Sequence, residues 1–140
     1  MGAEIFIKFL KIEDKRIVLQ VWDFGGEKEF HFLLPLYSRG SSGGIFMFDL
    51  TRYGTLIRVK EWLDTFKKGL SPGKQNPPII LVGGKLDLKD QIAVSKKEAE
   101  KIRHQYNFFD YIECSSKTGE NVEDIFESLL KRILKDFQLI

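Results

Sequence analysis

The sequence predicts an α/β domain in which a mostly parallel sheet is flanked by helices. Apolar runs of strand length alternate with segments of helical periodicity along most of the chain. The run at 79–82 is apolar throughout, as expected for a parallel strand that is buried on both faces. A polar motif also follows each of three apolar runs, at the strand ends where open α/β sheets bind ligands: Asp23-Phe24-Gly25-Gly26, Gly84-Lys85-Leu86-Asp87 and Ser115-Ser116-Lys117.

The first third of the chain predicts a hairpin, a short helix and a strand. Residues 3–11 and 16–22 alternate apolar and polar side chains around a polar turn at 13–15, which favours an antiparallel pair. A helical pattern runs from Gly25 to Arg39, and Pro35 inside it predicts a short, kinked or mobile helix. Glycines and serines at 40–44 lead into a strand at 45–48.

Helices and strands then alternate to the end of the chain. The helix predicted over 55–68 has one apolar face, made by Leu56, Val59, Trp62, Leu63 and Phe66. After the strand at 79–82, Ser95 and Glu98 have the spacing of a capping box and predict a helix to Tyr106. A strand at 109–114 and a helix at 121–137 complete the pattern. The buried stripe of that last helix is predicted to be Val122, Ile125, Phe126, Leu129, Leu130 and Ile133.

Length and composition favour one domain over residues 1–140. The net charge of +2 gives no reason to expect nucleic acid as a partner. The lone cysteine, Cys114, excludes an internal disulfide, so we expect a cytoplasmic location. No apolar stretch approaches the roughly 18 residues of a membrane span. The residues at the two ends match no lipidation motif, so no lipid anchor is expected in this chain.

The order of the three motifs and the text around them resemble the small GTPases of the Ras superfamily, and among them the Rab-like branch. The resemblance extends over essentially all of the chain. The segments that carry it are Val21-Trp22-Asp23-Phe24-Gly25-Gly26-Glu27, Tyr37-Ser38-Arg39-Gly40, Met47-Phe48-Asp49-Leu50-Thr51, Leu81-Val82-Gly83-Gly84-Lys85-Leu86-Asp87-Leu88 and Glu113-Cys114-Ser115-Ser116-Lys117-Thr118-Gly119.

The resemblance implies roles for the first motif. Asp23 matches the aspartate that holds Mg²⁺ through water, and Gly26 matches the glycine whose N–H contacts the γ-phosphate. The alternative is that Asp23 only begins a turn. Glu27 stands where the family has the glutamine that orients the attacking water, and its charge would oppose the γ-phosphate. We therefore assign no catalytic residue in this motif, and we do not expect Glu27 to promote hydrolysis.

The other two motifs match the part of the family's site that recognises guanine. Asp87 would accept hydrogen bonds from N1–H and the 2-amino group of guanine, and Lys85 would lay its methylene stem along the base. Ser115, Ser116 and Lys117 match the last motif, where a backbone N–H meets the guanine O6. The family's asparagine before Lys85 is Gly84 here, a loss of about 1–3 kcal/mol by analogy with other lost hydrogen bonds. The alternative for Lys85 and Asp87 is an exposed polar turn.

The family's phosphate loop, G-x-x-x-x-G-K-[ST], does not occur in these 140 residues. The resemblance thus implies a G domain without its first strand, P-loop, first helix and switch I threonine. The strands at 16–22 and 45–50 would then face each other as unpaired edges. Three explanations stay open: a shortened form of a longer protein, rearrangement or strand exchange with another copy, or a strand donated by a partner.

Two functional readings follow. In the first, the chain is a small GTP-binding protein by descent whose ligands would be GTP or GDP with Mg²⁺, and whose nucleotide binding and hydrolysis are lost or very weak. In the second, it is a non-catalytic interaction module on a GTPase scaffold, completed by self-association or by a partner strand. Protein effectors or regulators would then contact residues 30–34, where Phe30, Phe32, Leu33 and Leu34 are large and apolar.

Overall fold

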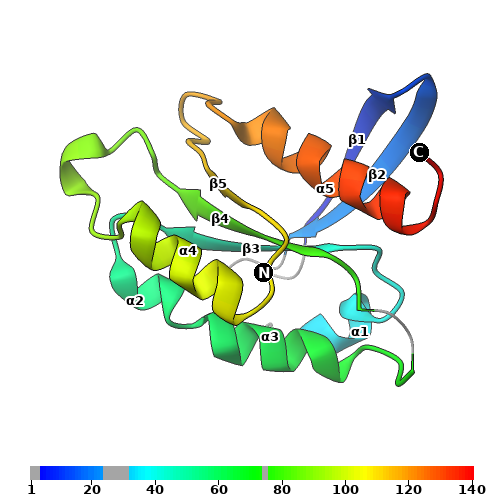
Figure 1. Cartoon of the computed structure of the whole chain (residues 1–140), viewed down its shortest axis with the longest axis horizontal. Coiled ribbons are helices and arrows are strands. Elements are labelled where there is room, and N and C mark those ends of the chain that lie inside the picture. The colour runs from blue at the N-terminus through cyan, green and yellow to red at the C-terminus, as the bar shows by residue number, and fades with distance from the viewer. Residues whose placement is uncertain (1–3, 24–31, 74–75) are drawn as a thin grey trace.

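The computed structural model describes residues 4–23, 32–73 and 76–140. Strands and helices alternate as the sequence predicts, and Figure 1 shows helices on both sides of a central sheet. The elements, in chain order, are β1 (Glu4–Ile12), β2 (Lys15–Asp23), α1 (Leu34–Ser38), β3 (Gly44–Asp49), α2 (Tyr53–Leu56), α3 (Val59–Lys68), β4 (Ile79–Gly84), the 3₁₀ turn η2 (Lys89–Gln91), α4 (Lys96–Gln105), β5 (Tyr111–Glu113) and α5 (Val122–Asp136).

The predicted hairpin is confirmed. β1 and β2 pair antiparallel, from Glu4 opposite Asp23 to Ile12 opposite Lys15. Glu13 and Asp14 form the turn with φ of 46° and 68°. A two-residue hairpin loop of type I′ needs positive φ at both positions, and aspartate is among the residues that tolerate it.

The second sheet is parallel and has the order β3-β4-β5. Its central strand is the continuous apolar run, and the side chains from Ile80 to Val82 are fully buried. One face packs against α2, α3 and α4 through Phe46, Phe48 and the helix residues around them. The other face packs against α5 through Ile80 and Val82. The sheet is therefore covered on both faces, as the prediction required.

The hairpin is attached to the rest of the chain through α5. Ile12 at the hairpin end is buried against Leu130 and Leu134 of the helix. Lys8 adds an ion pair with Glu123, with Nζ 2.8 Å from Oε1, and its ammonium lies 4.7 Å from the centre of the Phe126 ring. Figure 1 shows the hairpin beside α5.

β2 and β3 do not pair with each other in the part of the chain that the structure describes; they belong to separate sheets. Within the described residues both strands therefore have an unpaired edge, as expected, whereas the expectation that the two edges face each other stays a prediction. In β3, the N–H groups of Gly44 and Leu50 donate to carbonyls beside β4. Since ladder bonds alternate along a parallel strand, the N–H groups of Ile45 and Met47 point away from β4. The Met47 side chain is 56% exposed.

Three boundaries differ from the prediction. The helix expected over 55–68 is two helices, because Ile57 and Arg58 have ψ of −10° and −4°, far from the α-helical value. The helix that contains Pro35 is short, as predicted, but it begins only at Leu34, so Pro35 lies in its first turn. A missing N–H in the first turn breaks no helical bond. The last strand is limited to residues 111–113. The capping box of Ser95 and Glu98 is present as predicted.

Candidate functional site

The loop after β4 is held in place by backbone bonds to the end of β5. Lys85 leaves the strand with φ of 66°, which turns the chain sharply at the carboxyl edge of the sheet. The N–H of Leu86 donates to the carbonyl of Cys114 at 2.9 Å, and the N–H of Cys114 donates to the carbonyl of Gly83 at 2.8 Å. Because the Leu86 side chain is also buried, the backbone that carries its neighbours Lys85 and Asp87 is held in place.

Asp87 and Ser115, predicted from separate motifs, are in direct contact. The Ser115 hydroxyl donates to Oδ1 of Asp87 at 2.8 Å and accepts from the N–H of Thr118 at 3.1 Å. Ser115 is completely buried, whereas Asp87 is partly exposed. The buried hydroxyl thus orients a carboxylate whose remaining lone pairs are available to donors from outside. Both residues were candidates, and the structure brings them together.

Lys85 has a partner that the sequence analysis did not identify as part of the site. Its Nζ lies 3.1 Å from Oδ2 of Asp49, the last residue of β3. Oδ1 of Asp49 accepts from the N–H and the hydroxyl of Thr51, at 2.9 and 2.7 Å. Burial acts to raise the pKa of Asp49, but the Thr51 hydrogen bonds and Lys85 outweigh it and lower that pKa. The available signal was the adjacency of the two strand ends in a parallel sheet.

Ser116 and Lys117 lie in an exposed turn beside this loop. The turn is closed by the N–H of Gly119, which donates to the carbonyl of Ser115 at 2.8 Å, with Gly119 at φ of 83°. Asn121 follows this turn, and its side-chain amide donates to the carbonyl of Glu113 at 2.8 Å. The third motif therefore lies next to the second, at the ends of neighbouring strands.

The first motif is placed differently. Asp23 is the last residue of β2 and is exposed, on a sheet separate from the one that carries Lys85 and Asp87. Gly26, Glu27 and Phe30 lie outside the described residues, so the expectations for them stay predictions. Within residues 4–23, 32–73 and 76–140, no group of three or more His, Cys, Asp or Glu is arranged to hold a metal ion.

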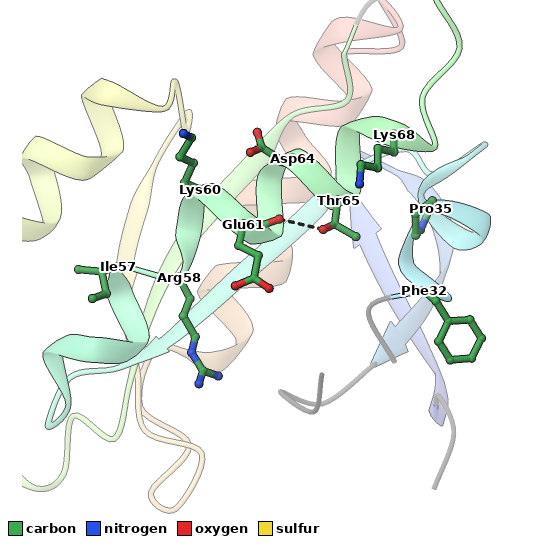
Figure 2. A pocket seen from close by; sticks show the side chains of 9 residues that line it. All are labelled: Phe32, Pro35, Ile57, Arg58, Lys60, Glu61, Asp64, Thr65 and Lys68. Atoms are coloured by element: carbon green, nitrogen blue, oxygen red, sulfur yellow. Dashed lines mark hydrogen bonds between the residues drawn. The ribbon is translucent and has the colours of Figure 1, made fainter. Parts of the chain in front are cut away.

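A pocket of about 860 Å³ lies elsewhere, between α3 and the segment that begins α1 (Figure 2). Figure 2 shows Arg58 and Glu61 on one side and Phe32 on the other. Phe32 is 71% exposed, while Leu34 is buried. Of the predicted interaction residues that are described, Phe32 and the half-buried Leu33 are accessible, and Leu34 is part of the core. The full lining is Phe32, Pro35, Ile57, Arg58, Lys60, Glu61, Asp64, Thr65 and Lys68.

A larger exposed apolar surface lies on the hairpin, and the sequence analysis did not identify it. Residues that pair across an antiparallel ladder share a face. The face away from α5 therefore carries Ile5 with Trp22, Ile7 with Gln20 and Phe9 with Val18. Its apolar side chains are exposed, up to 80% for Phe9. The Trp22 ring also contacts the Tyr37 ring of α1 in a tilted arrangement, with 4.5 Å between ring centres.

The chain matches known proteins over nearly its whole length. The model of the Ras family matches residues 1–135. Ras-related protein RABF2a of Arabidopsis thaliana is 36% identical over 133 residues, which are 95% of this chain and 64% of the relative. Ras-related protein Rab5 of Nicotiana tabacum is 32% identical over the same shares, and Ras-related protein RABC1 of Arabidopsis thaliana is 36% identical over 96% of this chain and 63% of the relative.

The chain thus spans somewhat less than two thirds of the length of these relatives. No helix within the described ranges has the length and apolar composition that a membrane-crossing segment requires. The parallel sheet, the helices on both its faces and the clustering of the second and third motifs at its carboxyl edge agree with the family match. The chain belongs to the Ras family of small GTPases, on its Rab-like branch.

Proposed function

We propose that these 140 residues carry the guanine-recognition part of a small GTPase site, that by themselves they bind GTP or GDP only weakly, through the base, and that they do not hydrolyse GTP. The observation that carries this proposal is the hydrogen bond between the buried Ser115 hydroxyl and Asp87. It joins two motifs that are 28 residues apart and fixes the carboxylate of Asp87, two residues after Lys85 in the same loop. This is the arrangement that a base bearing two adjacent N–H donors requires.

The described residues fit the base of the family's nucleotide ligand but not its phosphates and Mg²⁺. The base end fits, because Asp87 supplies acceptors and the stem of Lys85 supplies an apolar surface, with the turn at Ser116 and Lys117 next to them. The phosphate and Mg²⁺ end does not fit these residues. Asp23 is a single carboxylate on the other sheet, and G-x-x-x-x-G-K-[ST] is absent from the 140 residues. We therefore propose no hydrolytic step.

The test is an NMR titration of the chain with guanosine and, in parallel, with adenosine. We expect guanosine to shift the amide signals of Lys85, Asp87 and Ser116 with a dissociation constant on the order of 1 mM, equivalent to about 4 kcal/mol. Adenosine should shift them much less, because its pairing edge would present a ring nitrogen acceptor to the Asp87 carboxylate. Equal shifts with the two nucleosides, or none with guanosine, would contradict the proposal.

A second candidate function, a non-catalytic protein-interaction module, is favoured by the exposed apolar side chains of the hairpin face, among them Phe9 and Trp22, and by the exposed Phe32 beside α1. Among the described residues nothing pairs with the edge of β3 that faces away from β4, which makes this edge a further place for a strand from another copy or from a partner. Size-exclusion chromatography with light scattering tests self-association. A partner capture that is lost on Phe32→Ser and unchanged by added GDP would support the module reading, whereas capture that requires nucleotide would count against it.

A further inference from the structure

The geometry points to Asp49 as a positioning residue of the purine site, which acts by fixing the side chain of Lys85 across the ends of β3 and β4. The inference rests on the proposed function and extends it to a residue outside the predicted motifs. Its ligand is the base of a guanine nucleoside. Asp49 would not touch that base; it would act through Lys85.

The carboxylate of Asp49 is held in one orientation. Thr51 donates two hydrogen bonds to Oδ1, and the backbone N–H of Asp49 itself donates to the Thr55 hydroxyl at 2.8 Å. The side chain is only 12% exposed. Its second oxygen, Oδ2, is the one that meets Lys85. A carboxylate with this many fixed partners provides a stationary anchor for an ammonium group.

Lys85 is positioned from both ends. Its backbone follows Gly84, which lies directly opposite Asp49 in the parallel register. Its ammonium is bound to the Asp49 carboxylate, so the four-carbon stem spans the ends of two neighbouring strands. The side chain is 59% exposed and therefore keeps an open side. A lysine stem without a partner samples many rotamers, and a planar base that stacks on it would have to order them first.

The substitution Asp49→Asn tests this role. Asparagine keeps the shape and can still accept from Thr51, but it removes the charge that holds the ammonium. We expect a lower NMR order parameter at Cε of Lys85 and a guanosine dissociation constant raised about two- to fivefold, the range expected for a partly exposed ion pair. In a Lys85→Met background, where the stem remains without its ammonium, Asp49→Asn should change the affinity for guanosine no further.

Asp90→Asn is the matched control, since it removes one negative charge from an exposed residue of the neighbouring turn. Guanosine affinity that stays unchanged in Asp49→Asn, or that falls equally in the Lys85→Met background, overturns the positioning role while the proposed function stands. A wild-type chain that does not bind guanosine contradicts the proposed function, and the positioning role falls with it. If Asp49→Asn does not fold, the wild type alone decides: a Cε of Lys85 as mobile as that of the exposed Lys117 overturns the inference.

Discussion

The buried hydroxyl of Ser115 is the place where a single substitution tests the architecture of the base loop. Ser115→Ala removes two hydrogen bonds, one to the Asp87 carboxylate at 2.8 Å and one from the N–H of Thr118 at 3.1 Å. A hydrogen bond to a charged group contributes about 1.5–3 kcal/mol and a neutral one about 1 kcal/mol. Asp87 is partly exposed and recovers a bond to water. The expected loss in the free energy of unfolding is therefore about 2 kcal/mol.

Urea unfolding followed by tryptophan fluorescence and circular dichroism measures this loss. With a slope of about 2 kcal/mol per molar urea, the midpoint should fall by about 1 M while the slope stays unchanged. Ser71→Ala is the control, because Ser71 is exposed and its substitution should move the free energy by less than about 0.5 kcal/mol. Equal midpoints for Ser115→Ala and Ser71→Ala would refute the conclusion that this hydroxyl joins the two motifs.

Three further predictions concern other parts of the chain. Gly69→Ala should destabilise the fold by about 2 kcal/mol or more, because a Cβ there would collide with the Pro35 carbonyl of α1. Gly54→Ala is the control, since a Cβ at Gly54 meets open space and should be nearly neutral, and thermal unfolding compares the two variants. Gly84→Asn should fit, since a Cβ at this position would meet no atom closer than 3.5 Å. Because it restores the family residue, it should tighten guanosine binding by up to about tenfold, and weaker binding in the titration would refute this. Burial and the hydrogen bond to Glu113 raise the pKa of Tyr111, so the fold should lose stability as pH rises above about 10, where the phenol ionises in the unfolded chain. Tyr111→Phe should reduce this loss, which unfolding curves recorded at alkaline pH would measure.

The sequence was most informative where burial dictates residue type. The continuous apolar run at 79–82 predicted the central strand, and the apolar stripe of residues 122–133 predicted the helix beneath it. The polar turn at Glu13 and Asp14 predicted the hairpin because few other loops join two alternating strands so closely. Each of these signals is local, or periodic along a single element, and therefore needs no knowledge of the tertiary contacts.

Features that depend on tertiary contacts were not predicted. The break between α2 and α3 has no proline or glycine at Ile57 and Arg58 to mark it. Leu34 was assigned to an interaction surface, but it is buried. The exposed face of the hairpin alternates in the way a half-buried strand does, and only the docking of α5 on the opposite face decides which side is covered.

The site shows the same division. Lys85, Asp87 and Ser115 were identified from their motifs, yet only the folded chain shows the bond between Asp87 and Ser115. Asp49 belongs to one of the segments that carry the family resemblance, but the sequence analysis assigned it no role. The role that we propose for it depends on which strand end lies next to Lys85. Sequence motifs thus named the side chains that we propose face the base, and the structure added Asp49 as the residue that we propose positions one of them.

The most direct test of the central claim compares GDP and guanosine as ligands of the 140-residue chain, by calorimetry or NMR titration in the presence of Mg²⁺. If only the base is recognised, the diphosphate adds little, and the two dissociation constants should agree within about tenfold, or 1.4 kcal/mol. GDP binding at micromolar concentration or tighter, with guanosine far weaker, would show that this chain seats the phosphates itself and would contradict the account.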